Sequence, residues 1–114
     1  MTEGVSAIIY PVKDLATAKV LFGELLGVQP HTDESYYVGY KVGALDVGLD
    51  PHGHGKGMTG PVGYWQVEDI NASVKALVEA GGTVGQEPKD VGGGKLIGTV
   101  TDTDGNTIGL IQQP

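Results

Sequence analysis

The residues with the clearest capacity for chemistry are two histidines in a glycine-rich stretch. The segment 50–60 reads DPHGHGKGMTG, with His52 and His54 two positions apart and Asp50 close by. Two imidazoles in this spacing can bind a transition metal together with a carboxylate. No third ligand is held there by a strand or helix, so the favoured interpretation is a solvated loop. His31, the remaining histidine, receives no role.

Other catalytic signatures are missing from the chain. It has no cysteine, which removes disulfides, thiolate metal sites and a cysteine nucleophile. It contains no nucleophile elbow, phosphate-binding loop or dinucleotide fingerprint. The segment 92–94 is three glycines, but it lacks the lysine and hydroxyl residue of a phosphate loop, so we expect a mobile flap there.

Composition narrows the class of protein. The 114 residues carry a formal net charge of -7, which argues against a nucleic-acid partner and is weakly compatible with a cationic ligand. There is no long apolar run that would predict a membrane span. The first residues, Met-Thr-Glu-Gly, lack the basic start and apolar stretch of a signal peptide, so a cytoplasmic location is expected. The length suits one compact domain.

The elements that must position any site follow from an internal repeat. The segment 12–15, Val-Lys-Asp-Leu, recurs as Val-Glu-Asp-Ile at 67–70, an offset of 55 residues. Gly27 and Gly82, which follow the two apolar stretches, keep the same offset. Each half is therefore predicted to contain a strand followed by a helix, built to one plan.

Pattern and turn residues extend this plan to two βαβββ modules. Asp14 and Asp69 have the chemistry of helix N-caps, and Gly27 that of a C-cap. The predicted strands are 6–12, a short one at His31 near the end of the first helix, 36–42, 44–49, 62–67, 83–86, 95–101 and 107–112, with helical stripes over 15–26 and 70–78. A tight hairpin is predicted at Gly43 and Ala44. The modules cover about 5–50 and 61–113 of a single domain, 1–114.

These features together resemble the vicinal oxygen chelate superfamily, which includes glyoxalase I, extradiol dioxygenases and bleomycin-resistance proteins. The resemblance is carried by a strand ending in Val-x-Asp-Leu, a helix ending in Leu-Gly, and a terminal motif. The terminal motif consists of Asp102, Asp104, Gly105, Asn106, Ile108, Leu110 and Ile111. The resemblance implies an α+β fold: a cup-shaped, partly open eight-stranded mixed sheet, with helices on its convex side.

The resemblance also implies four metal-ligand positions, one per strand, usually histidine or glutamate. In this chain they fall on Ala7, Gly48, Val62 and Gly109. None of these side chains can coordinate a divalent ion. We therefore expect no metal and no cofactor, and an open, apolar cup floor.

Strand alternation predicts which other side chains share the cup face. From the four ligand positions, and from Gly39 lying opposite Gly48 across a two-residue hairpin loop, the face contains Ile9, Tyr37, Lys41, Asp46, Asp50, Tyr64, Gln66, Thr107 and Ile111. Tyr37 and Tyr64 are expected to form aromatic walls, and Gln66 to offer hydrogen bonds. Asp46 beside Lys41 is read as a cross-strand ion pair rather than a general base. Trp65 has the opposite parity and is expected in the core, as are Phe22 and Leu77.

The favoured hypothesis is a metal-independent binding protein of the bleomycin-resistance type, which sequesters an apolar or aromatic small molecule. Its predicted ligand-binding residues are Ala7, Ile9, Tyr37, Asp46, Gly48, Val62, Tyr64, Gln66, Gly109 and Ile111. The alternatives are a lyase, isomerase or dioxygenase with an atypical metal site, and an interaction module whose cup is filled by its own side chains. By resemblance we also expect a homodimer.

Overall fold

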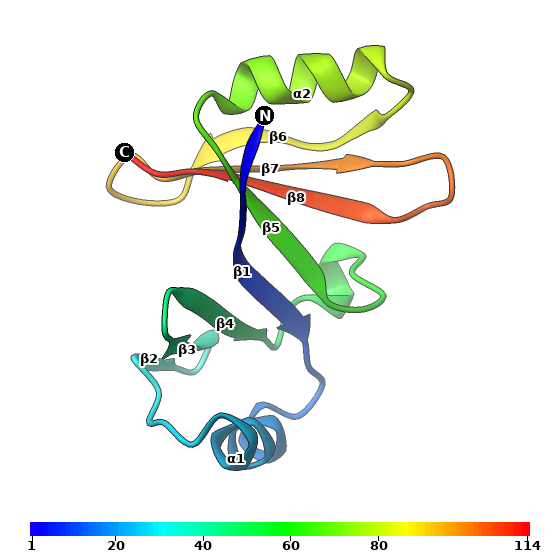
Figure 1. The fold of residues 1–114 in the computed structure, drawn as a ribbon. Coiled ribbons are helices and arrows are strands. Elements are labelled where there is room, and N and C mark those ends of the chain that lie inside the picture. The colour runs from blue at the N-terminus through cyan, green and yellow to red at the C-terminus, as the bar shows by residue number, and fades with distance from the viewer. The chain divides into compact units, whose positions relative to one another are not determined.

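A computed structural model describes residues 1–114 and contains two βαβββ modules in sequence (Figure 1). The elements are β1 (Thr2–Pro11), α1 (Leu15–Leu26), β2 (Thr32–Glu34), β3 (Tyr37–Val42), β4 (Leu45–Asp50), the short 3-10 helix η1 (His54–Lys56), β5 (Val62–Val67), α2 (Ile70–Glu79), β6 (Thr83–Asp90), β7 (Leu96–Thr101) and β8 (Thr107–Gln112). The predicted element order is confirmed. Neither helix is long and apolar enough to cross a membrane.

Three elements differ from the sequence prediction. β1 begins at Thr2 rather than at residue 6, and η1 occupies part of the connector that was expected to be a loop. β6 continues to Asp90, beyond the predicted end at residue 86. Its pairing with β7 is irregular between Val84 and Gln86 and again between Gln86 and Lys89. The added residues, Glu-Pro-Lys-Asp at 87–90, are charged apart from one proline and show no alternation of apolar and polar side chains, which is why the sequence pattern ended at residue 86.

The strands form an eight-stranded mixed sheet in the hydrogen-bonded order β2-β3-β4-β1-β5-β8-β7-β6, which confirms the α+β class. The chain divides into two compact units, Met1–Ser6 with Gly63–Pro114, and Ala7–Val62. We call these the β5–β8 unit and the β1–β4 unit. The first residues of β1 thus belong with the second module, which the repeat alone did not predict.

In the β1–β4 unit, α1 packs on one face of the sheet. Four side chains of β3 and β4 form its buried core: Val38, Tyr40, Val47 and Leu49. Phe22 of α1 packs against this cluster, as predicted, and its ring centroid lies 4.8 Å from that of Tyr10. The apolar stripe of α1 therefore fixes which sheet face carries the helix, and leaves the opposite face for other roles.

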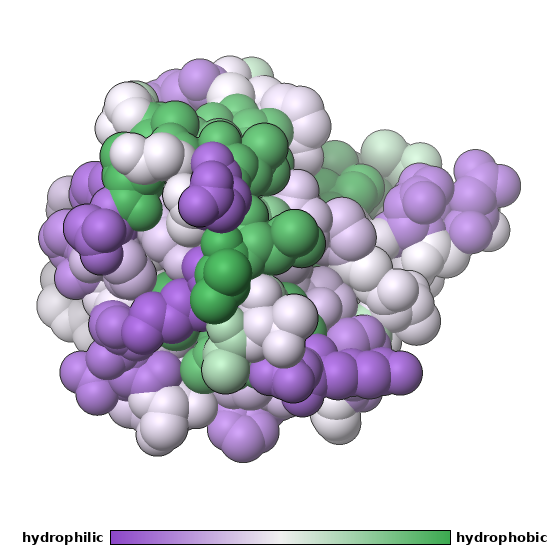
Figure 2. All heavy atoms as spheres, turned by 90° about the horizontal axis from the view of Figure 1, so that it is seen from below, coloured by the Kyte–Doolittle hydropathy of each residue, from purple (hydrophilic) through white to green (hydrophobic).

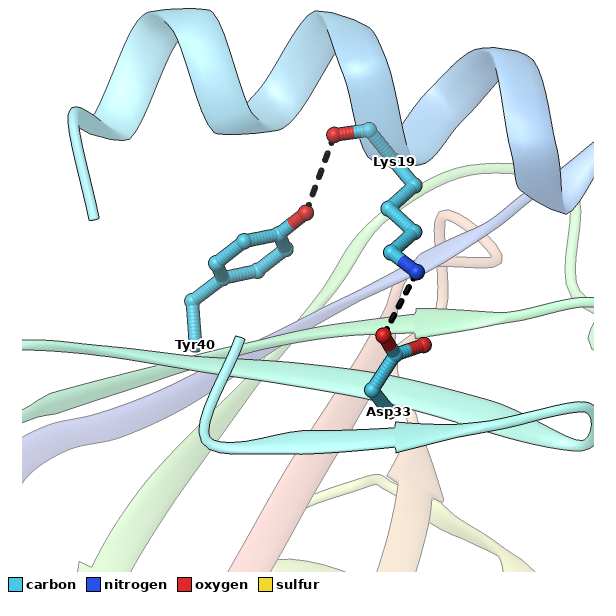
Figure 3. Close-up of polar contacts among 3 residues, drawn as sticks. All are labelled: Lys19, Asp33 and Tyr40. Atoms are coloured by element: carbon cyan, nitrogen blue, oxygen red, sulfur yellow. Dashed lines mark hydrogen bonds and ion pairs between the residues drawn. The ribbon is translucent and has the colours of Figure 1, made fainter. Parts of the chain in front are cut away.

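A buried tyrosine ties α1 to the sheet beneath it (Figure 3). The Tyr40 hydroxyl donates a hydrogen bond of 3.0 Å to the backbone carbonyl of Lys19 in α1. Burial raises the pKa of this hydroxyl above its usual value, because the low-dielectric interior disfavours the phenolate. The Lys19 ammonium group pairs with Asp33 of β2. Both side chains of that pair are well exposed, so the buried tyrosine is the firmer anchor.

In the β5–β8 unit, α2 covers one face of β6, β7 and β8. The core contains Val67, Ile70, Val74, Val100 and Leu110, with Leu77 packed against it as predicted. Trp65 is not part of this core: it is 40% exposed, so its predicted burial was wrong. Trp65 alternates with Tyr64 along β5, as predicted. However, α2 packs on β6, β7 and β8, and it does not extend over Trp65 on β5.

Both predicted N-caps are confirmed. The Asp14 carboxylate accepts a hydrogen bond of 3.0 Å from the backbone N–H of Thr17, and Asp69 accepts one of 3.1 Å from Ala72. Gly27 ends α1 in the left-handed region, with φ 68°. The caps show that residues next to each helix end determine where the helices of the repeat begin and where α1 stops.

The turn between β7 and β8 leads to a prediction about acid stability. The Asp102 carboxylate accepts hydrogen bonds from the side-chain amide and backbone N–H of Asn106, at 2.9 and 2.8 Å. These bonds, the side-chain one foremost, lower the pKa of Asp102 below the ordinary 3.8. The carboxylate therefore stabilises the fold above about pH 4, and this contribution is lost as the pH falls further. We expect Asp102→Asn to lower the urea midpoint at pH 7. The urea midpoints at pH 7 and pH 3 should therefore lie closer together in this variant than in the unmodified chain.

A neighbouring acid provides the control for this experiment. Asp104 lies in the same turn, but its carboxylate is not one of the acceptors that close it. Asp104→Asn should leave the pH dependence of the urea midpoint close to that of the unmodified chain. An equal narrowing in both variants would show that net charge, rather than the Asp102 hydrogen bonds, causes the acid dependence.

Candidate functional site

The candidate site residues of the β1–β4 unit lie on the sheet face opposite α1. β4 pairs with β1 in parallel, Ala7 with Asp46 and Ile9 with Gly48. It pairs with β3 in antiparallel, and Gly39 faces Gly48 across the predicted two-residue turn. The hairpin register is therefore confirmed.

The ring of Tyr37 covers the position where a metal ligand of β4 would stand. A β-carbon built on Gly48 would lie 2.6 Å from Cζ of Tyr37 and in contact with its hydroxyl oxygen. The same β-carbon would lie 2.7 Å from Cδ1 of Ile9, and one on Gly39 would lie 3.1 Å from Cε2 of Tyr37. The two glycines leave room for the ring, which lies over them rather than standing as a wall. The floor here is thus aromatic and covered, not open as the glycines alone suggested.

The polar end of this face is an ion pair. The Lys41 ammonium nitrogen lies 2.9 Å from a carboxylate oxygen of Asp46, which confirms the predicted cross-strand pair. Both side chains are about half exposed, so water screens their attraction. A carboxylate already paired with a cation is a poor proton acceptor. The other carboxylate on this face, Glu34, pairs with Tyr37 across β2 and β3 and is exposed to water.

The β5–β8 unit repeats the arrangement of a tyrosine over a glycine. Tyr64 pairs with Gly109 across the parallel strands β5 and β8, and Gln66 pairs with Ile111. A β-carbon on Gly109 would lie 2.7 Å from Cδ1 of Tyr64 and 2.8 Å from the carbonyl oxygen of Gly63. Gly109 and Ile111 are buried, whereas Tyr64 and Gln66 are partly exposed. Each unit therefore covers its glycine ligand position with a tyrosine ring.

The four family ligand positions do not fit a divalent metal. Ala7 and Val62 are buried and carry no donor atom, while Gly48 and Gly109 have no side chain. At the glycines, even a β-carbon would collide with a neighbour, so an imidazole or carboxylate has no room without displacing a tyrosine. Within each unit, no group of three or more histidine, aspartate or glutamate side chains is placed to hold a metal ion.

The histidine-containing connector is organised by Asp50, a buried carboxylate at the end of β4. This carboxylate accepts hydrogen bonds of 2.8 Å from the backbone N–H of His52 and 2.9 Å from the Lys56 ammonium group. His52 and His54 are themselves exposed. Asp50 was expected on the cup face, but it turns into the connector and shapes η1. The Asp-Pro-His sequence contained that signal, since aspartate commonly bonds a backbone N–H two residues on.

Sequence reasoning placed both tyrosines on the site face but missed their coupling to the glycines. The available signal was the pairing itself, because an aromatic residue beside a cross-strand glycine commonly folds over it. Recognising this requires the register of Gly39, Gly48 and Gly109 against their neighbours, which alternation alone does not supply.

Several solved structures share the fold of this chain. The chain superposes on methylmalonyl-CoA epimerase from Mycobacterium tuberculosis with a TM-score of 0.72 and 18% identity, covering 99% of this chain and 89% of that one. A glyoxalase/bleomycin resistance protein/dioxygenase superfamily member from Vibrio splendidus 12B01 gives 0.72 and 18%, covering 94% and 97%. The Mn(II)-bound glyoxalase from Novosphingobium aromaticivorans gives 0.73 and 17%, covering 97% of this chain and 39% of that one. At these low sequence identities, the similarity shows a shared fold but not a shared function.

Among curated proteins, none matches this sequence. The family model described as the Glyoxalase/Bleomycin resistance protein/Dioxygenase superfamily matches residues 4–110, which is nearly the whole chain. The two βαβββ modules, the strand order and this match agree. The chain belongs to the glyoxalase/bleomycin resistance protein/dioxygenase superfamily.

Proposed function

We propose that this chain binds an apolar or aromatic small molecule without a metal and without chemical conversion. The observation that carries the proposal is the tyrosine ring lying over a glycine at a ligand position in each unit, Tyr37 on Gly48 and Tyr64 on Gly109. Where metal-dependent relatives require donor atoms, this chain offers aromatic surface. Aromatic rings contribute large contact areas with few rotatable bonds, which suits the binding of flat apolar molecules.

The residues around the two rings support this class of ligand. Ile9 lies with Tyr37 over Gly48 in the β1–β4 unit, and Ile111 shares the strand face of Gly109 in the β5–β8 unit. Gln66 supplies a neutral group that both donates and accepts hydrogen bonds. A mostly apolar surface with a few polar groups is the usual composition of a small-molecule site. The net charge of -7 weakly favours cationic ligands and disfavours anionic ones.

The absence of conversion is proposed from the side chains present. Asp46 is paired with Lys41, and the family ligand positions hold no donor atoms. Acid–base catalysis needs a group free to exchange a proton with the substrate. Sequestration requires only the binding surface, as in a bleomycin-resistance protein.

Elemental analysis tests the metal-independent part of this proposal. The chain is dialysed with excess Ni, Zn, Mn and Fe(II) and then against metal-free buffer. We expect less than stoichiometric metal to remain. One tightly held metal per chain would overturn the proposal and favour a lyase or dioxygenase activity. Substituting His52 and His54 with alanine would then show whether the connector is the site.

Ligand binding is tested with N-phenyl-1-naphthylamine, an uncharged aromatic probe whose fluorescence rises in apolar surroundings. We expect Tyr37→Ala and Tyr64→Ala each to weaken binding at least about tenfold, the loss of about 1.4 kcal/mol that one aromatic contact supplies. Tyr37→Phe keeps the ring and should bind within a few-fold of the unmodified chain. The matched control is Tyr36→Ala, which removes an exposed tyrosine adjacent in sequence. Equal binding by all four variants would place the probe elsewhere and contradict the proposal.

A further inference from the structure

The short strand β2 adds two polar side chains to the site face of the β1–β4 unit. Thr32 pairs with Gly39, and Glu34 pairs with Tyr37, in the antiparallel ladder of β2 and β3. Directly paired residues point to the same side of a sheet, so both side chains lie on the face that carries the Tyr37 ring. A β-carbon on Gly39 would lie 3.6 Å from Cβ of Thr32, which agrees with this placement. Sequence reasoning did not include either side chain in the site.

Glu34 is the carboxylate of this face that no cation balances. The three ion pairs of the β1–β4 unit all use aspartates, and Glu34 belongs to none of them. The Lys41 ammonium group, which is the positive charge on the same face, is already paired with Asp46. Glu34 is exposed to water, so a charged group on a ligand can reach it. One negative charge is therefore available beside the Tyr37 ring.

The Tyr37 ring is oriented to receive a cation. One side of the ring is turned toward Gly39 and Gly48, whose missing β-carbons leave room for it. The other side therefore points away from the sheet, and Tyr37 is partly exposed. The face of an aromatic ring carries a negative electrostatic potential and attracts a cation within about 6 Å of its centroid. Cross-strand partners have β-carbons about 5 Å apart, so the Glu34 carboxylate can reach a cation held over this ring.

We infer that the ligand of this site carries an ammonium group, which binds over the Tyr37 ring and pairs with Glu34. This inference rests on the proposed function, because it assigns a charge to the aromatic molecule that the chain is proposed to bind. The ring supplies a cation–π contact and the carboxylate supplies an ion pair, neither of which an uncharged ligand gains. Each attraction is worth about a few-fold in affinity at an exposed position, so an aromatic amine should bind at least about fivefold more tightly than an alcohol of the same shape. Glu34 thus determines the charge specificity of the site.

The outer face of α1 offers apolar surface and a carboxylate, but no aromatic ring. Figure 2 views the side of the molecule on which α1 lies and shows hydrophobic side chains gathered on its surface. Val20, Leu21 and Leu25 are well exposed on this helix, and Glu24 lies among them in the sequence and is also exposed. Because α1 packs on the sheet face opposite the site, Glu24 provides a matched control for Glu34 in the same unit.

Three naphthalene compounds that differ in charge test the inference: 1-naphthylmethylammonium, 1-naphthalenemethanol and 1-naphthoate. Their dissociation constants are measured by displacement of N-phenyl-1-naphthylamine at low ionic strength, where exposed charges are least screened. In the unmodified chain, we expect the ammonium compound to bind at least about fivefold more tightly than the alcohol, and the carboxylate to bind more weakly than the alcohol. Glu34→Lys should weaken binding of the ammonium compound at least about fivefold and leave that of the alcohol within about twofold. Glu24→Lys changes the net charge equally and should leave all three constants within about twofold.

The possible results separate this inference from the proposed function. Equal binding of the ammonium compound and the alcohol, or an unchanged preference in Glu34→Lys, would overturn the inference and leave the proposed function standing. Equal weakening by Glu24→Lys and Glu34→Lys would also overturn it, because net charge rather than Glu34 would be the cause. No binding by any of the three compounds or by the probe would overturn both. Lysine is readily accommodated on an exposed edge strand, so the circular dichroism of Glu34→Lys should match that of the unmodified chain. Glu34→Gln, which keeps the size of the side chain, provides a second variant and should weaken binding of the ammonium compound about threefold.

Discussion

Replacing Gly109 with alanine is expected to lower the free energy of unfolding by about 2–3 kcal/mol, the range for forcing an extra carbon into a packed interior. The new β-carbon would lie 2.8 Å from the carbonyl oxygen of Gly63 and 2.7 Å from the Tyr64 ring. Gly63 belongs to β5, whose next residues pair with β8, so its carbonyl cannot move without disturbing that pairing. Urea unfolding followed by circular dichroism measures the change.

Gly48→Ala provides the comparison, with an expected cost of about 1 kcal/mol. Here the collision is with the ends of the Tyr37 and Ile9 side chains, which can turn away. Removing the ring in the double variant Gly48→Ala, Tyr37→Ala should make the alanine nearly neutral relative to Tyr37→Ala alone. The corresponding double variant at Gly109 and Tyr64 should stay destabilised, because the Gly63 carbonyl remains. Equal costs at both glycines would show that the backbone collision is not what limits Gly109.

Gly48 and Gly109 stand at two positions where metal-dependent members of the family carry a ligand, and they oppose a larger side chain in different ways. At Gly48 a larger side chain is opposed by movable groups, so a ligand residue there requires only that Tyr37 gives way. At Gly109 the backbone itself opposes any side chain. A single substitution therefore cannot rebuild a metal site, and the tyrosine and glycine of each unit act as one feature. Binding and stability should thus change together when either member of a pair is replaced.

The features predicted correctly from sequence are those that depend on neighbours along the chain. Asp14 and Asp69 cap their helices through N–H groups three residues away, and the turn at Gly43 joins two adjacent strands. The hairpin then fixes Gly39 opposite Gly48, which placed Tyr37 on the correct face. Local chemistry determines all of these, and the 55-residue repeat supplied a second example of each helix start.

The features that were missed depend on contacts between distant elements. Trp65 has the parity of a core residue, but only the placement of α2 over β6, β7 and β8 shows that it is uncovered. The Tyr37 ring could have stood upright, and its position over Gly48 follows from the packing of β1, β3 and β4 together. Asp50 shares the parity of the site face yet turns into the connector to bind the Lys56 ammonium group.

The repeat also predicts equal roles for matched positions, and the two helices depart from this. α2 buries Ile70, Ser73 and Val74, whereas no residue of α1 is fully buried. The sequence does not indicate this difference, since both helices carry an apolar stripe of similar length. The difference arises because each unit has its own core, and residues at one offset meet different neighbours.

Ile70→Ala is accordingly expected to cost about 3–4 kcal/mol, near the middle of the range for removing a buried aliphatic side chain. Ile70 is completely buried at the start of α2, among Val67, Val74, Val100 and Leu110. Its backbone N–H donates a 2.8 Å hydrogen bond to the Gln112 side chain, which holds the helix start against β8 and limits collapse of the cavity. Urea unfolding at neutral pH measures the loss.

Leu15→Ala is the matched change at the same position of the repeat and should cost only about 1–2 kcal/mol, because Leu15 is partly exposed and loses less contact. The ratio of the two losses in the free energy of unfolding tests whether burial or position in the repeat determines how much a residue contributes to stability. Equal costs would mean that the two helix starts are energetically equivalent despite their different burial. A larger loss at Leu15 would show that α1 is held more tightly than its exposed outer face suggests.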